Sequence, residues 1–134
     1  MDPVCHFEIP ADNVKRAEKF YESAFGWNIK SMPNMGYSFL QTSETEKDGM
    51  VKKRGRINGG MLKRQDCIQS PIITVVTVDL DSSIKKIKKQ GGEIVKDKFK
   101  VGDIGFSAYF KDTEGNILGI FEPSKKYLEK DSEN

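Results

Sequence analysis

The chain contains one histidine, His6, in a short apolar stretch, "PVCHFEIPADN", whose pattern predicts a β-strand. Glu8 follows two residues later, so both side chains should point to the same face of that strand. An imidazole titrates near neutral pH, and a carboxylate beside it would favour its charged form. His6 and Glu8 therefore form either a catalytic acid/base pair or a hydrogen-bonded structural pair. Cys5 should point to the opposite face, which argues against a Cys/His nucleophile pair.

Several aromatic and small polar residues are candidates for the wall of a binding cavity. Tyr37 and Phe39 alternate along one predicted strand, and Ser107 and Tyr109 alternate along another. Aromatic walls suit a flat or apolar ligand, although packing in the hydrophobic core is the alternative for each of them. We predict that the ligand-binding residues are Trp27, Tyr37, Phe39, Met61, Ser107 and Tyr109.

The elements that would position these residues follow one another in a repeated order. A helix should run from a cap at Asp12 or Asn13 to Gly26, and a second from a cap at Asp79 or Asp81 to Gly91. Pro10 should end the first strand, because proline donates no hydrogen bond to a sheet. A polar, mobile loop is expected over residues 43–55. The predicted strands cover residues 4–9, 27–31, 37–42, 56–63, 71–78, 93–101, 105–111 and 117–122.

This order is βαβββ, repeated once, which predicts an α+β protein. Half of the chain alone would expose one face of its sheet, so the two halves should pack into one domain. We expect that domain to span residues 1–134, with one module at 1–66, a second at 70–123 and a C-terminal tail at 124–134.

The charge balance excludes some classes of function. The chain has 134 residues, with 22 basic and 20 acidic side chains, whereas nucleic-acid-binding domains usually carry a strong basic excess. The segment 52–64 concentrates six basic residues, which could attract phosphate or carboxylate groups or form a solvated loop. No stretch approaches the roughly 20 apolar residues that cross a membrane. With no signal-peptide pattern and two cysteines far apart, we expect a cytoplasmic protein with reduced thiols.

Three stretches resemble the vicinal oxygen chelate superfamily, which includes glyoxalase I, bleomycin-resistance proteins and extradiol dioxygenases. They are "HFEIPADNVKRAEKFYESAFGW", "VVTVDLDSSIKKIKKQGGEIV" and "FKDTEGNILGIFEP", with "INGGML" between the first two. The chain is most similar to a small glyoxalase-related branch of undefined function. The resemblance implies two βαβββ modules that form a curved mixed sheet around a cavity. In the family's enzymes, the first and fourth strands of each module each supply one ligand to a divalent metal.

The resemblance also allows the metal ligands to be checked position by position. His6 matches the first ligand position. The predicted strand over 56–63 has no His, Asp, Glu or Gln, the third position falls near Ile73, and the fourth falls on Gly119. Glu122 is a weak substitute, because strand alternation should turn it away from the face of Gly119. A divalent metal with His6 as a ligand stays open, but the ligand set is incomplete, since a dedicated metal site usually needs three or more protein ligands, and no cofactor is assigned.

These observations favour a protein that binds an unidentified small molecule in the cavity between the modules, without a full metal site. The alternative is a metal-dependent lyase, isomerase or dioxygenase of the same superfamily, similar to lactoylglutathione lyase. A third interpretation is an interaction module that uses the fold only as a scaffold. The expected partner is a small molecule rather than a nucleic acid or a membrane, and the resemblance is compatible with a homodimer.

Overall fold

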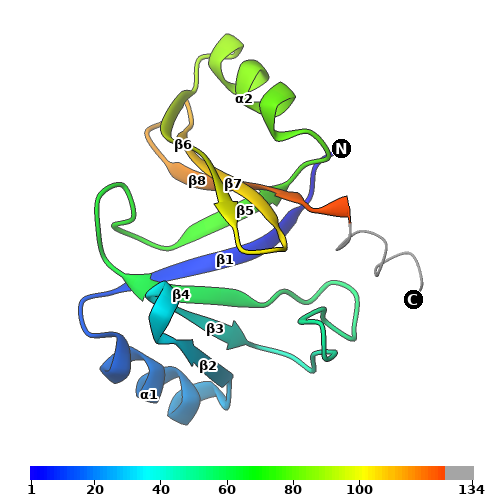
Figure 1. The fold of residues 1–134 in the computed structure, drawn as a ribbon. Helices are drawn as coiled ribbons and strands as arrows, with labels where there is room; N and C mark the ends of the chain where they lie inside the picture. The colour runs from blue at the N-terminus through cyan, green and yellow to red at the C-terminus, as the bar shows by residue number, and fades with distance from the viewer. Residues whose placement is uncertain (126–134) are drawn as a thin grey trace. The chain divides into compact units, whose positions relative to one another are not determined.

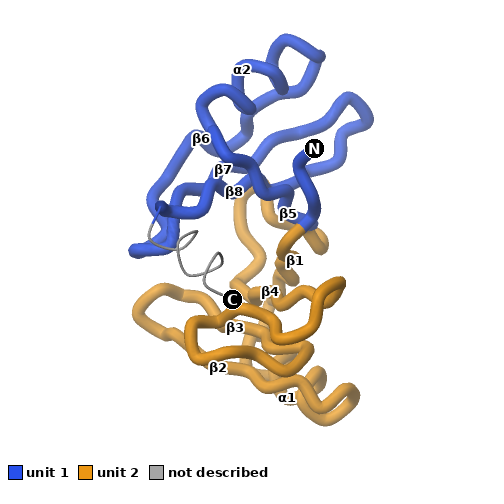
Figure 2. Tube along the Cα trace, turned by 90° about the vertical axis from the view of Figure 1, so that its right-hand side faces the viewer, with its two compact units in different colours: residues 1–4, 73–134 blue, residues 5–72 orange. Residues whose placement is uncertain are grey.

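The computed structural model describes residues 1–125, so most of the predicted tail at 124–134 lies outside the described residues. The chain divides into two compact units, coloured separately in Figure 2. Unit 2 comprises residues 5–72, and unit 1 comprises residues 1–4 together with the chain from residue 73 onward. The order of helices and strands confirms the predicted α+β class with two βαβββ modules (Figure 1).

The first module forms a four-stranded mixed sheet with the strand order β2-β3-β4-β1. Strands β1 and β4 are parallel, whereas β3 is antiparallel to both β2 and β4. The elements are β1 (Val4–Ala11), α1 (Val14–Phe25), β2 (Asn28–Met32), a 3₁₀ helix (Pro33–Met35), β3 (Tyr37–Gln41) and β4 (Gly59–Lys63).

The second module repeats this arrangement with the strand order β5-β8-β7-β6. Here β5 and β8 are the parallel pair, and β7 is antiparallel to β6 and β8. The elements are β5 (Ile72–Val76), α2 (Leu80–Lys89), β6 (Glu93–Val101), β7 (Gly105–Lys111) and β8 (Ile117–Pro123).

Helix α1 covers one face of the sheet in unit 2. The Asn13 side chain accepts a hydrogen bond from the Arg16 amide at 3.0 Å and caps its start, and Gly26 ends it in the left-handed conformation with φ 70°. The apolar side of α1 packs on a core of the buried residues Ala11, Leu40 and Met61. Helix α2 has the equivalent core in unit 1, which is built from Leu80, Ala108 and Ile120.

The prediction that Pro10 ends the first strand is wrong, because β1 continues to Ala11. The Ala11 carbonyl accepts from the Arg64 amide at 3.0 Å, so the backbone groups of Ala11 face the β4 side. Since backbone groups of successive strand residues point to alternate edges, the missing N–H of Pro10 faces away from β4. The proline therefore removes no hydrogen bond from this pairing.

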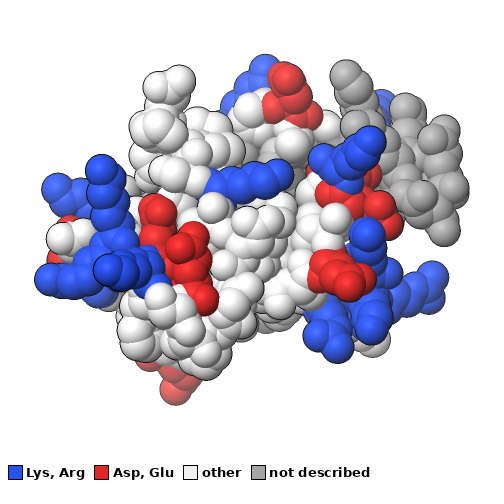
Figure 3. All heavy atoms as spheres, turned by 90° about the horizontal axis from the view of Figure 1, so that it is seen from below, with Lys and Arg blue, Asp and Glu red and all other residues white. Residues whose placement is uncertain are grey.

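The distribution of charged side chains on the surface agrees with the nearly equal numbers of basic and acidic residues. In the view of Figure 3, lysine and arginine side chains lie in mixed groups with aspartate and glutamate. Within residues 1–125, no helix combines the length and apolar character needed to cross a membrane.

Candidate functional site

The two faces of the sheet in unit 2 carry different chemistry. The face under α1 is mainly apolar. One polar contact with the helix is the Ser38 hydroxyl, which donates to Glu18 at 2.8 Å. Strand alternation places His6 and Glu8 of β1 on the other face, together with Tyr37 and Phe39 of β3. We call this second surface the His6 face. The structure thus brings four of the predicted site residues to one side of one sheet.

The centre of the His6 face is a hydrogen bond between two residues that are distant in the sequence. The Nε2 atom of His6 lies 2.9 Å from the hydroxyl oxygen of Tyr37. Both Glu8 of β1 and Phe39 of β3 pair with Gly60 of β4. A Cβ atom on residue 60 would overlap the Tyr37 phenol, so the tyrosine ring occupies the space in which a β4 side chain would stand.

The electrostatic state of His6 follows from its surroundings. Burial lowers the pKa of His6 from 6.5 to about 4, because desolvation penalises the charged imidazolium. The ring is therefore neutral at pH 7 and can either accept a hydrogen bond from the Tyr37 hydroxyl or donate one to its oxygen. An imidazole with so low a pKa is a weak general base near neutrality, although it remains a good hydrogen-bonding group.

A loop lies beside the His6 face and reaches Phe39. A Cβ on Gly49 would lie 4.0 Å from the Phe39 ring, so Gly49 of segment 43–55 lies beside this side chain. The segment folds back on itself through a β-bridge between Thr45 and Val51. Asn58 anchors the segment, because its side chain accepts from the Thr42 amide at 3.0 Å and donates to the Thr45 hydroxyl at 2.9 Å. Sequence reasoning missed this role, which depends on contacts 13 and 16 residues apart.

Trp27 and Met61 do not join the other predicted residues of unit 2. Met61 is fully buried in the core under α1, and strand alternation explains this, because it directly follows Gly60. Trp27 precedes β2 and stacks on Tyr21 of α1, with ring centroids 4.9 Å apart and planes within 5°. Both residues therefore lie on the α1 side of the sheet, on the opposite face from Tyr37 and Phe39.

Ser107 and Tyr109 lie in unit 1, on one face of β7. The Ser107 hydroxyl donates to the carbonyl of Ile120 at 3.1 Å. Tyr109 is only 5% exposed and stacks on Phe99 of β6 with ring centroids 6.0 Å apart. Lys96 places its ammonium group 4.2 Å from the centre of the same Phe99 ring.

Comparison with known proteins gives this arrangement a family. Residues 4–43 match the family model described as bleomycin resistance protein-like N-terminal. A glyoxylase-like domain-containing protein of Didymella fabae is 32% identical over 117 residues, which cover 84% of this chain and 88% of that protein. The chain belongs to the glyoxalase/bleomycin-resistance superfamily.

Other members of the superfamily extend this result. A putative glyoxylase, CFP32, of Mycobacterium bovis is 26% identical over 118 residues, which cover 88% of this chain but 44% of that relative's length. A solved superfamily member from Vibrio splendidus superposes with a TM-score of 0.59 at 10% identity, and the match covers 92% of this chain and all of that one. At that identity the structural match supports the fold alone.

Two of the strands that carry metal ligands in the superfamily's enzymes have a glycine with a side chain packed close against it. On β4, the Tyr37 phenol fills the space beside Gly60. On β8, a Cβ on Gly119 would lie 2.7 Å from the Thr74 hydroxyl oxygen, so a larger residue at this position would require the Thr74 side chain to shift. Among residues 1–125, no three His, Cys, Asp or Glu side chains lie close enough together to hold an ion.

Glu122, the weak metal candidate, has a different role. Its Oε1 atom accepts a hydrogen bond from the backbone amide of Leu80 at 3.0 Å. Leu80 is the first residue of α2, where backbone amides lack partners within the helix and the helix dipole favours a negative charge. The geometry gives Glu122 the role of capping α2.

Proposed function

We propose that this protein binds a small molecule on the His6 face of unit 2 and that binding does not require a divalent metal. One observation carries the proposal. The Tyr37 phenol is hydrogen-bonded to His6 Nε2 at 2.9 Å and also fills the space next to Gly60 on β4, the strand equivalent to the one that supplies a second ligand in the superfamily's enzymes. A single imidazole that already has a partner is a poor basis for a dedicated metal site.

The same residues support recognition of a partly apolar organic molecule. Phe39 and Tyr37 offer aromatic surface, while His6 and the buried Glu8 offer polar atoms on the same face. Because His6 is neutral at pH 7, it would contribute a directed hydrogen bond rather than a charge. Such a face suits a ligand with a flat apolar part and at least one hydrogen-bonding group.

The chain provides a specific reporter for this proposal, because His6 is its only histidine and Trp27 its only tryptophan. In ¹⁵N-labelled protein kept in EDTA, the imidazole resonances report the His6 face, and the indole N–H reports the α1 side. We expect members of a library of small aromatic alcohols, amides and acids to shift the His6 resonances without moving the indole signal.

The matched control is Phe39→Ala, which removes apolar surface from the His6 face but leaves His6 and Tyr37 in place. It should weaken the binding of such a fragment by about tenfold, the factor equivalent to about 1.4 kcal/mol of lost contact. The proposal fails if no fragment shifts the His6 signals in EDTA, or if binding appears only after a divalent metal is added. The second outcome would favour the metal-dependent lyase, isomerase or dioxygenase instead.

A further inference from the structure

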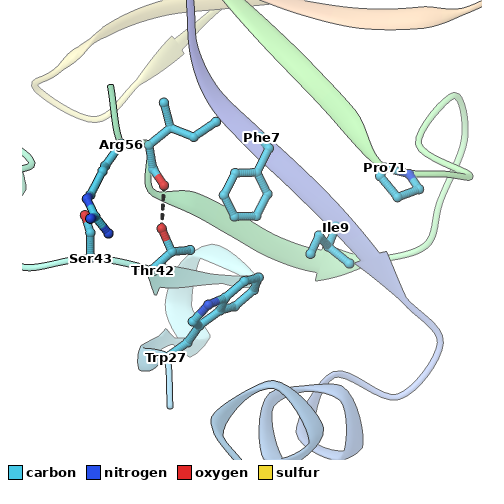
Figure 4. A pocket seen from close by; sticks show the side chains of 8 residues that line it. Phe7, Ile9, Trp27, Thr42, Ser43, Arg56 and Pro71 are labelled. Atoms are coloured by element: carbon cyan, nitrogen blue, oxygen red, sulfur yellow. Dashed lines mark hydrogen bonds between the residues drawn. The ribbon is translucent and has the colours of Figure 1, made fainter. Parts of the chain in front are cut away.

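Unit 2 contains a pocket on the α1 side of its sheet, apart from the His6 face. Its volume is about 460 Å³, within the range of pockets that hold small molecules. Figure 4 shows its side chains in two groups, with Arg56 and Ser43 on one side and Phe7, Ile9 and Pro71 on the other. The pocket is lined by Phe7, Ile9, Trp27, Thr42, Ser43, Arg56, Ile57 and Pro71.

The apolar side of the pocket is held in a fixed shape. The rings of Phe7 and Trp27 are 5.9 Å apart and tilted by 53°. Tyr21 stacks on the indole at 4.9 Å, and Phe7 lies so close to Gly59 that a Cβ there would come within 2.5 Å of its ring. Because neighbouring groups brace both rings, a flat ligand would meet a preformed aromatic surface and little side-chain entropy would be lost on binding.

The polar side of the pocket has unused hydrogen-bonding capacity. Among the described residues, Ser43 Oγ is buried without a hydrogen-bond partner, and Arg56 forms no ion pair with a carboxylate. The Thr42 hydroxyl, by contrast, already donates to the Ile57 carbonyl at 2.6 Å. A buried hydroxyl normally finds a partner, and a guanidinium matches the two oxygens of a carboxylate.

We infer that this pocket binds a flat apolar carboxylic acid. Its rings lie against Phe7 and Trp27, and its carboxylate takes hydrogen bonds from the Arg56 guanidinium and the Ser43 hydroxyl. This site is independent of the proposed function, because the β1 residues on its apolar side, Phe7 and Ile9, lie on the other face of the sheet from His6 and Tyr37. The two sites can therefore be tested separately in one sample.

The test uses biphenyl-4-acetate as the probe, its neutral amide as the matched ligand and the fluorescence of Trp27, excited near 295 nm, as the readout. We expect saturable quenching by the acid. Arg56→Gln should weaken binding by about tenfold, since it removes a charge-assisted pair from an otherwise intact pocket. The unaltered protein should bind the amide about as weakly as Arg56→Gln binds the acid. Ser43→Ala should weaken binding of the acid less than Arg56→Gln does.

Arg54→Gln is the control variant. It removes the same charge as Arg56→Gln, but the Arg54 side chain does not line the pocket. It should leave the affinity for biphenyl-4-acetate unchanged. The inference is overturned if quenching does not saturate, if the amide binds as well as the acid, or if Arg54→Gln and Arg56→Gln weaken binding equally. It is also overturned if the acid shifts the His6 resonances and leaves the Trp27 indole unmoved, a result that would support the His6 face as the binding site.

Discussion

His6 and Tyr37 lie 31 residues apart in the sequence, and their contact decides what the histidine can do. A lone strand histidine in this superfamily is a natural candidate for a metal ligand, and its neutral form is the one that binds metals. Here the phenol holds Nε2 and the neighbouring strand position is a glycine covered by the same ring. These contacts are the basis for our proposal that the side chain holds a hydrogen bond rather than an ion.

The buried imidazole predicts a specific dependence of stability on pH. The pKa of His6 is about 4 in the folded protein, against an ordinary value of 6.5, so the unfolded chain binds the proton more tightly between these values. The contribution of His6 to the free energy of unfolding is complete above pH 6.5 and falls by up to roughly 3 kcal/mol as pH drops to 4. Urea denaturation at several pH values between 7 and 4 measures this loss.

The control for this prediction is His6→Gln, whose amide can bond to Tyr37 but does not titrate. All carboxyl groups of the chain contribute equally to both proteins, so the difference between the two curves isolates His6. The unaltered protein should lose more stability than the variant over this range. Parallel curves would show that the imidazole is not desolvated.

At the scale of elements, the two helices are fixed at their starts by polar side chains from different sources. Asn13 and Asp79 cap α1 and α2 from the residue before each helix, and each is one of the two candidates that the sequence offered at that helix start. Glu122 adds a second cap to α2 from β8, 42 residues away in the sequence. The Glu122 carboxylate, which lies near a ligand position of the superfamily, thus links β8 to the start of α2.

Substitution of Glu122 separates its capping role from a metal role. Glu122→Ala leaves the Leu80 amide without its acceptor and should lower the free energy of unfolding by about 1 kcal/mol. Glu122→Gln keeps an acceptor oxygen and should cost clearly less, as measured by urea denaturation. If both variants are as stable as the unaltered protein, Glu122 is not a cap, and if Gln is as damaging as Ala, the charge rather than the hydrogen bond matters.

At the scale of the whole molecule, the sequence predicts the order of helices and strands well, because the signals for each βαβββ module lie between residues close together in the sequence. The caps before the two helices, the stop at Gly26 and the β-branched stretch of the strand predicted at 71–78 depend only on neighbouring residues. The site is less predictable, because it depends on pairing between strands. Strand alternation groups His6 with Glu8 and Tyr37 with Phe39, but only the register of β3 on β4 places the phenol over Gly60.

The measurement that tests the central claim most directly is the melting temperature of metal-stripped protein with added Zn²⁺, Ni²⁺, Mn²⁺, Co²⁺ or Fe²⁺, compared with His6→Ala. A metal bound at the His6 face at a hundredfold excess over its dissociation constant would stabilise the fold by about 2.7 kcal/mol. We predict that no metal raises the melting temperature of the unaltered protein more than that of His6→Ala. A rise that disappears in His6→Ala would contradict the account, because His6 would then be a metal ligand despite its bond to Tyr37.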